Sequence, residues 1–132
     1  MNKRVLYIED EKFLLEQIQI ALEDFEVIPV SSAAEGMELV NKMDFDAVLL
    51  DIMMPPPDDI DPETVGYGRT TGVEVCRRIR NMKPHLPIVV LSVVRDPGII
   101  NRIKAAGANE ILYKPAPPSK IIDTLNNVLK GG

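Results

Sequence analysis

The stretch 45-FDAVLLDIMMP-55 decides the fold of this chain. Its part 47-AVLL-50 is a continuous apolar run, and Asp51 closes it. Strands of a parallel sheet with helices on both faces are apolar along their whole length rather than at alternate positions. The stretch therefore predicts a central parallel strand whose carboxyl end carries an acid.

Four more short apolar runs lie along the chain, and segments with helical periodicity separate all of them. The runs are 5-VLYI-8, 27-VIPV-30, 88-IVVL-91 and 110-EILY-113. The helices are expected over 11–23, 32–43, 72–82, 96–107 and 117–130. This alternation predicts an α/β fold, a single doubly wound (βα)5 domain of flavodoxin-like class over residues 1–132. The expected parallel sheet has the order 2-1-3-4-5.

Capping residues mark where several of these helices begin and end. Ser32 and Glu35 have capping-box spacing, Asp96 precedes Pro97 at the start of the fourth helix, and Gly107 is expected to stop it. The periodicity of the first helix predicts one buried face, made by Phe13, Leu14, Ile18, Ala21 and Leu22.

Composition excludes several classes of function. Twenty acids stand against 15 bases, for a net charge of −5, and no basic cluster is present, which argues against nucleic-acid binding. No apolar run is long enough to cross a membrane, and Cys76 has no partner for a disulfide. We therefore expect a cytoplasmic protein that binds other proteins or small ions, and neither nucleic acid nor membrane.

Polar side chains close four of the five expected strands. They are Glu9 and Asp10, then Asp51, then Ser92, and finally Lys114 followed by Pro115. Carboxyl ends of parallel strands share one edge, and the first and third strands are neighbours, so three carboxylates should crowd there. At about 5 Å and an effective dielectric of about 20, each pair of like charges costs roughly 3 kcal/mol.

We expect a bound cation to neutralise these crowded carboxylates. An all-oxygen cluster that leaves room for water suits Mg²⁺, and Ser92 and Lys114 supply donors for a further anion such as a phosphoryl group. Plainer interpretations remain open: Asp10 as a helix cap, Ser92 as a turn residue and Lys114 as an exposed lysine. Such ordinary roles do not explain why all four strand ends carry polar groups at one crevice.

Four motifs in this order resemble those of bacterial two-component response-regulator receiver domains over essentially the whole chain. They are 7-YIEDE-11, 48-VLLDIMMP-55, 88-IVVLSV-93 and 112-LYKP-115. The resemblance implies a stand-alone receiver domain that acts as a phosphorylation-controlled signalling switch. A sensor histidine kinase or phosphotransfer protein would supply the phosphoryl group, and the chain would lose it slowly without being a turnover enzyme.

The resemblance also assigns roles to residues of this chain. They are the phosphoacceptor Asp51; the metal ligands Glu9, Asp10, Asp51 and the main-chain carbonyl of Met53; the phosphoryl-contacting Ser92 and Lys114; and the loop-shaping Pro115, cis in this family. Mg²⁺ is the implied cofactor. Output is expected through contacts of a downstream protein with the fourth helix, fifth strand and fifth helix, and dimerisation on phosphorylation is left open.

The chain departs from the family pattern in three places. An acidic insertion at 55–71 follows the phosphoacceptor strand, and its prolines and glycines argue against regular structure apart from one helical turn at 61-DPET-64. A solvated loop, a lid and a docking loop for a partner all remain open for it. Ile111 stands at the switch position where the family carries Tyr or Phe, and Val93 stands where it carries Ala or Gly.

Two other functions compete with the switch. A Mg²⁺-dependent phosphohydrolase would use Asp51 as a covalent nucleophile, but it would need a second acid, and Met53 occupies the nearest place for one. A receiver-like binding module that is never phosphorylated is kept open by Ile111 and Val93.

Overall fold

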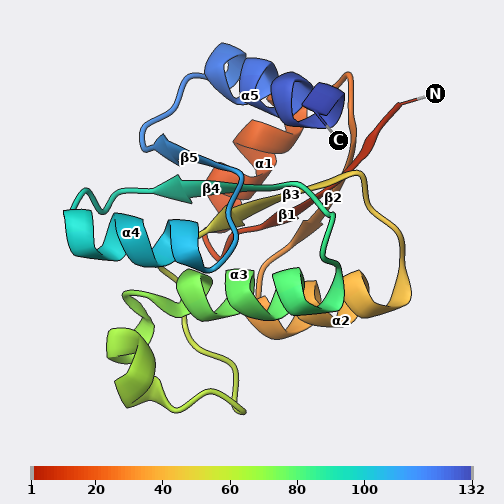
Figure 1. Cartoon of the computed structure of the whole chain (residues 1–132). Coiled ribbons are helices and arrows are strands. Elements are labelled where there is room, and N and C mark those ends of the chain that lie inside the picture. The colour runs from red at the N-terminus through yellow and green to blue at the C-terminus, as the bar shows by residue number, and fades with distance from the viewer. Residues whose placement is uncertain (1, 132) are drawn as a thin grey trace.

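Five parallel strands form one sheet between two layers of helices in the computed structural model, which describes residues 2–131 (Figure 1). The strands are β1 Arg4–Ile8, β2 Glu26–Val30, β3 Ala47–Asp51, β4 Ile88–Ser92 and β5 Glu110–Tyr113. Their order is β2-β1-β3-β4-β5, so the predicted fold and strand order are confirmed. Asp51 lies opposite Leu91, and Ser92 lies opposite Tyr113, which brings the polar strand ends to one edge.

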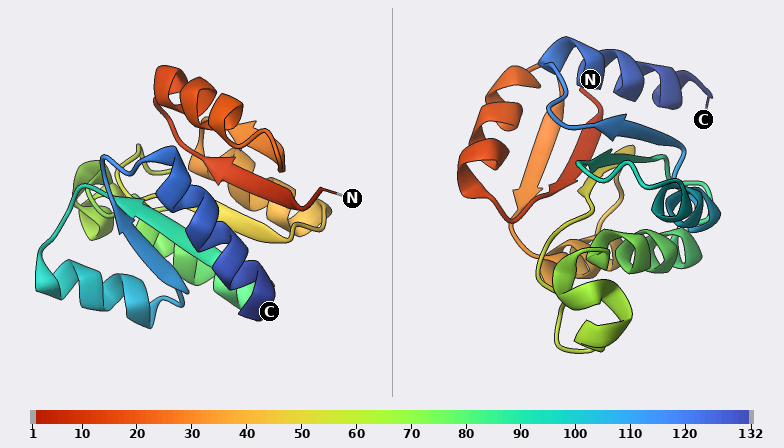
Figure 2. Two further views of the ribbon diagram at one scale, coloured as in Figure 1. Left: turned by 90° about the horizontal axis from the view of Figure 1, so that it is seen from above. Right: turned by 90° about the vertical axis from the view of Figure 1, so that its left-hand side faces the viewer.

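Helices cover both faces of the sheet. They are α1 Lys12–Ala21, α2 Ala33–Lys42, α3 Thr71–Met82, α4 Pro97–Ala105 and α5 Pro118–Gly131. Figures 1 and 2 show α1 and α5 on one face and α2, α3 and α4 on the other. This arrangement is the doubly wound architecture that the alternation of apolar runs and helical segments predicts.

The sheet divides the interior into two cores. Successive residues of a strand point to opposite faces, so Leu6 and Ile8 pack towards α2, α3 and α4, whereas Val5 and Tyr7 pack towards α1 and α5. Burial of each such side chain contributes about 1.5 to 3 kcal/mol. Because both faces of the central strands β1, β3 and β4 are buried, these strands are apolar almost throughout, as 47–50 indicates.

The predicted helix ends are confirmed, but one predicted core residue is not. The Ser32 side chain accepts a hydrogen bond from Glu35 N at 3.2 Å, and Asp96 accepts one from Gly98 N at 2.7 Å. Phe13, however, is 69% exposed, so its place on the buried face of α1 is wrong. The buried stripe follows the four-residue spacing of Leu14, Ile18 and Leu22, and position 13 falls one helical step outside it.

The insertion at 55–71 is ordered and lies against α3. It contains a 3₁₀ segment, η1 (Pro62–Gly68), whose backbone is not helical at Val65–Tyr67. The expected helical turn is therefore confirmed, and a second short 3₁₀ piece beyond this kink was not expected. Ile60 and Val65 are buried, which gives the segment its own apolar anchor. The Asp59 carboxylate also pairs with Arg78 of α3 at 2.8 Å. In Figure 1 this segment projects beyond α3, away from the sheet.

Candidate functional site

Three carboxylates meet at the carboxyl edge of the sheet. Glu9 and Asp10 follow β1, and Asp51 ends the neighbouring strand β3. One oxygen atom from each lies within 4.8 Å of the others. Among the residues that the structure describes, this is the one group of three or more acidic, histidine or cysteine side chains close enough to hold a metal ion. Three carboxylates at this spacing fit a hard divalent cation.

Lys114 joins two of these carboxylates. Its Nζ donates a hydrogen bond to Glu9 Oε1 at 2.8 Å and lies 3.0 Å from Asp51 Oδ1. Glu9 is 1% exposed and Asp51 is 5% exposed, so water screens these charges little. Although burial alone would lower the pKa of Lys114, its pairing with Glu9 and Asp51 raises that pKa above its ordinary value. The ammonium group is therefore a fixed positive charge.

One ammonium group does not neutralise the whole cluster. Burial raises the pKa of Asp51 to about 7, with Lys114 lowering it and Glu9 raising it further. Burial and then Glu9 also raise the pKa of Asp10. The site without a cation thus holds more carboxylate than its local positive charge supports, which is the electrostatic condition that a bound divalent cation relieves.

Ser92 reaches the same edge but faces its own loop. It is the last residue of β4 and is fully buried. Its Oγ accepts a hydrogen bond from Val94 N at 2.9 Å and donates one to Val94 O at 3.1 Å. In this state the hydroxyl group is engaged with its own turn, so contact with a group on Asp51 requires the side chain or the loop to move.

The remaining predicted residues fall at or near the edge. Met53 lies two residues beyond β3 with an exposed side chain. The Lys114–Pro115 peptide bond is cis, as the resemblance implies. Ile111 is not part of the cluster, since it packs half-buried against the core on the α2, α3 and α4 face. The structure therefore brings the acids and Lys114 together and leaves Ile111 in the core beside them.

Gly72 explains how tightly α3 approaches the end of β3. A Cβ atom at position 72 would lie 2.6 Å from Asp51 O and 2.6 Å from Ile52 Cα. Gly72 N also donates a hydrogen bond to Ile52 O at 2.8 Å. Only glycine permits this contact, which ties the start of α3 to the backbone that carries Asp51.

Sequence reasoning missed Tyr7 as a residue of the site. Tyr7 is fully buried in β1, and its hydroxyl group donates a hydrogen bond to Glu9 Oε1 at 3.5 Å. Burial, then Glu9 and Asp51, raise the pKa of Tyr7 above its ordinary value. A usable signal was present, because residues 7 and 9 differ by two positions and side chains two apart on a strand point to the same face.

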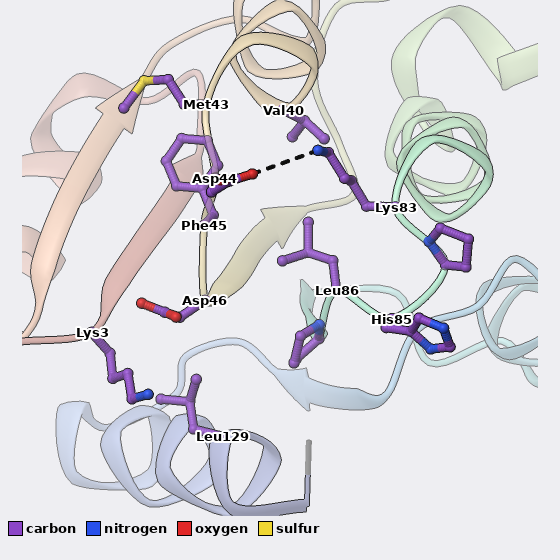
Figure 3. A pocket seen from close by; sticks show the side chains of 12 residues that line it. Lys3, Val40, Met43, Asp44, Phe45, Asp46, Lys83, His85, Leu86 and Leu129 are labelled. Atoms are coloured by element: carbon purple, nitrogen blue, oxygen red, sulfur yellow. Dashed lines mark ion pairs between the residues drawn. The ribbon is translucent and has the colours of Figure 1, made fainter.

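A separate cavity of about 430 Å³ lies at the opposite edge of the sheet (Figure 3). Residues that precede β1, β3 and β4 line it, including Lys3, Asp46 and His85. Lys83 and Asp44 form an ion pair across it at 3.7 Å. Its charged groups are thus of both signs, in contrast with the acidic cluster at the carboxyl edge, and we assign it no role.

Comparison with known proteins agrees with this geometry. The family model described as "Response regulator receiver domain" matches residues 5–126. This chain belongs to that family. The chemotaxis protein CheY of Thermotoga maritima is 26% identical to this chain, over 98% of this chain and 100% of the length of CheY. The alkaline phosphatase synthesis transcriptional regulatory protein PhoP of Bacillus subtilis is 26% identical to this chain, over 98% of this chain and 50% of the length of PhoP.

Solved structures of receiver domains share the fold. The CheY-like receiver domain protein of Methanospirillum hungatei superposes with a TM-score of 0.80 at 22% identity, over 100% of both chains. The present receiver domain spans about half the length of PhoP. No helix within residues 2–131 has the length and apolar character that crossing a membrane requires. The predicted cytoplasmic location stays a prediction.

Membership of this family makes the chain a two-component signalling protein related to CheY and PhoP. Receiver domains interact with histidine kinases or phosphotransfer proteins, and their acidic pocket is of a kind that holds a metal ion. This accords with the switch predicted from the sequence.

Proposed function

We propose that this receiver domain switches its signalling state when Asp51 accepts a phosphoryl group. The observation that carries the proposal is the position of the Asp51 carboxylate, at the end of a rigid central strand, 3.0 Å from Lys114 Nζ and grouped with Glu9 and Asp10. A nucleophile held on a strand is aimed better than one on a loop.

Glu9, Asp10, Asp51 and the main-chain carbonyl of Met53 would hold Mg²⁺, which supplies positive charge against the oxygens of the transferring phosphoryl group. A carboxylate oxygen of Asp51 attacks phosphorus in a kinase phosphohistidine. The new P–O bond forms as the P–N bond breaks, and the imidazole leaves with the bonding electron pair.

Lys114 and Ser92 would complete the phosphoryl site. Lys114 Nζ, already beside Asp51, donates to a phosphoryl oxygen, and Ser92 Oγ turns from Val94 to donate to another. Pro115 follows Lys114 and shapes the loop from which that side chain projects.

The rest of the proposal concerns organisation and partners. Residues 1–132 form one receiver domain with an insertion at 55–71. A sensor histidine kinase or phosphotransfer protein in the cytoplasm supplies the phosphoryl group. Output passes to a downstream protein through the face of α4, β5 and α5 or through the insertion, and phosphorylation-dependent dimerisation is a further form of output. The chain is a switch rather than a turnover enzyme, since Met53 supplies no second acid.

Incubation with acetyl phosphate and Mg²⁺ tests this function. We expect one phosphoryl group per chain, removed by hydroxylamine as an acyl phosphate is, and no adduct in the Asp51→Asn variant. Asp59→Asn is the matched control, because Asp59 is an exposed acid of the insertion. Equal labelling of Asp51→Asn and the parent would remove Asp51 from its role. Phosphate release without an adduct would favour a phosphohydrolase, and the absence of any reaction would favour an unphosphorylated binding module.

A further inference from the structure

A buried tyrosine hydroxyl group lies beside the acidic cluster, and the proposed chemistry does not use it. Tyr7 packs with its ring among Ile18, Leu49 and Leu91 in the core on the α1 and α5 face. Its hydroxyl group donates to Glu9 Oε1 at 3.5 Å. A phenol hydroxyl group carries its proton at neutral pH, so it can donate to the carboxylate beside it.

Glu9 depends on a small number of donors. Its Oε1 accepts hydrogen bonds from Lys114 Nζ at 2.8 Å and from the Tyr7 hydroxyl group. Its Oε2 accepts one from Glu11 N at 3.3 Å. Glu9 is almost completely buried, so water cannot readily replace a donor that is lost. A buried carboxylate that loses a donor bears the cost of its desolvation.

Lys114 contacts two carboxylates, and phosphorylation of Asp51 would change one of them. Its Nζ lies 2.8 Å from Glu9 Oε1 and 3.0 Å from Asp51 Oδ1. A phosphoryl group on Asp51 adds strongly accepting anionic oxygens on one side of this ammonium group. As Lys114 turns towards them, Glu9 Oε1 loses its shortest contact, and Tyr7 is the side-chain donor already beside it.

We propose that Tyr7 is a positioning residue of the phosphoryl site, whose hydroxyl group holds Glu9 while Lys114 turns to the phosphoryl group on Asp51. The inference rests on the proposed function. Without that hydroxyl group, Glu9 has Lys114 as its one side-chain donor among those identified in the structure, and it competes with the phosphoryl oxygens for the ammonium group.

The Tyr7→Phe variant separates this role from a general one. When no phosphoryl oxygens are present, Lys114 still donates a hydrogen bond to Glu9. The Mg²⁺ affinity of Tyr7→Phe, measured by calorimetry, should therefore stay within about twofold of that of the parent. At saturating Mg²⁺, beryllofluoride affinity and the rate of labelling by acetyl phosphate should each fall about three- to tenfold, as expected for one hydrogen bond. Tyr113→Phe is the matched control, since Tyr113 is exposed at the end of β5 with Arg95 over its ring.

Several results would overturn the inference. Unchanged labelling and beryllofluoride binding in Tyr7→Phe would do so, as would an equal fall in Mg²⁺ affinity or an equal effect of Tyr113→Phe. Should the variant not fold, the parent labelled with carbon-13 at tyrosine Cζ supplies the test: the Tyr7 resonance must shift between Mg²⁺ alone and Mg²⁺ with beryllofluoride. If the parent accepts no phosphoryl group, the proposed function is contradicted as well. If the parent and Tyr7→Phe are labelled equally, only the role of Tyr7 is contradicted.

Discussion

At the scale of a single residue, the buried carboxylate of Asp51 has an electrostatic cost. It ends an entirely buried strand, and its carboxylate lies beside Glu9 and within the same group as Asp10. Burial and that neighbouring charge raise its pKa to about 7, against 3.8 for an ordinary aspartate. Without a cation, the folded protein therefore holds the Asp51 carboxylate in an unfavourable charged state at higher pH, and Lys114 offsets this only in part.

Asp51→Asn should consequently stabilise the protein without Mg²⁺ in a pH-dependent way. The folded parent binds a proton that its unfolded chain has already released between pH 3.8 and about 7, so parental stability falls as pH rises through that window. The variant lacks this loss. Near pH 8 we expect its free energy of unfolding to exceed that of the parent by about 1 to 3 kcal/mol.

Urea denaturation in EDTA across this pH range measures the effect. The difference between variant and parent should shrink towards pH 4 and should also shrink when excess Mg²⁺ replaces EDTA, because the cation neutralises the parental carboxylates. A difference that does not vary with pH would show that the charge of Asp51, with Glu9, Asp10 and Lys114 around it, is not its source.

At the scale of elements, the insertion is a packed part of the domain. The N–H of Met54, just before the insertion, donates to Gly68 O at 3.2 Å and so closes the segment at its base. Gly68 has a φ of +107°, which favours glycine. Buried Ile60 and Val65 provide its apolar anchor. The insertion packs along α3, and none of its residues takes part in the hydrogen bonds among Glu9, Asp51 and Lys114 described above.

Ile60→Ala should therefore destabilise the whole domain rather than only loosen a loop. Removal of a buried isoleucine side chain costs about 2 to 4 kcal/mol. Asp59→Ala, which breaks only an exposed pair with Arg78, should cost less than about 1 kcal/mol. Thermal and urea unfolding of both variants provide the measurement. If Ile60→Ala costs no more than Asp59→Ala, the insertion lies outside the cooperative unit.

At the scale of the whole molecule, contacts connect the proposed phosphoryl site to the face of α4, β5 and α5. Ser92 ends β4, and its carbonyl oxygen accepts a hydrogen bond from Lys114 N at 2.9 Å, which links the end of β4 to the end of β5. Three residues after Ser92, Arg95 lies 4.5 Å from the centre of the Tyr113 ring. Release of Ser92 from Val94 would therefore disturb this contact between the loop before α4 and the end of β5, although Ile111 supplies no aromatic ring there.

Amide exchange should detect that coupling. With Mg²⁺ and beryllofluoride, we expect altered exchange at 93–106 and 111–120, because these segments are joined directly to Ser92 and Lys114 and packed elements shift between discrete arrangements. Asp51→Asn should show no such change under the same conditions. Changes confined to 55–71 would instead make the insertion the output element and exclude the face of α4, β5 and α5.

Local patterns in the sequence were enough to determine the elements and the candidate site. The apolar run at 47–50 requires a strand buried on both faces, and the caps Ser32 and Asp96 act on amide groups within a few residues of themselves. Parallel strands with right-handed connections then carry Glu9 and Asp51 to a common edge, wherever their side chains finally point.

Only the tertiary structure decided how side chains share that edge. Lys114 bridges Glu9 and Asp51, and the Tyr7 hydroxyl group reaches Glu9, because segments distant in the sequence pack together and limit the rotamers that fit. The packing of the insertion against α3 has the same origin. The sequence by itself thus determined which strands form and which polar groups end them, since these depend on neighbours along the chain. Which group each one contacts depends on packing across the sheet, and that was decided by the tertiary structure.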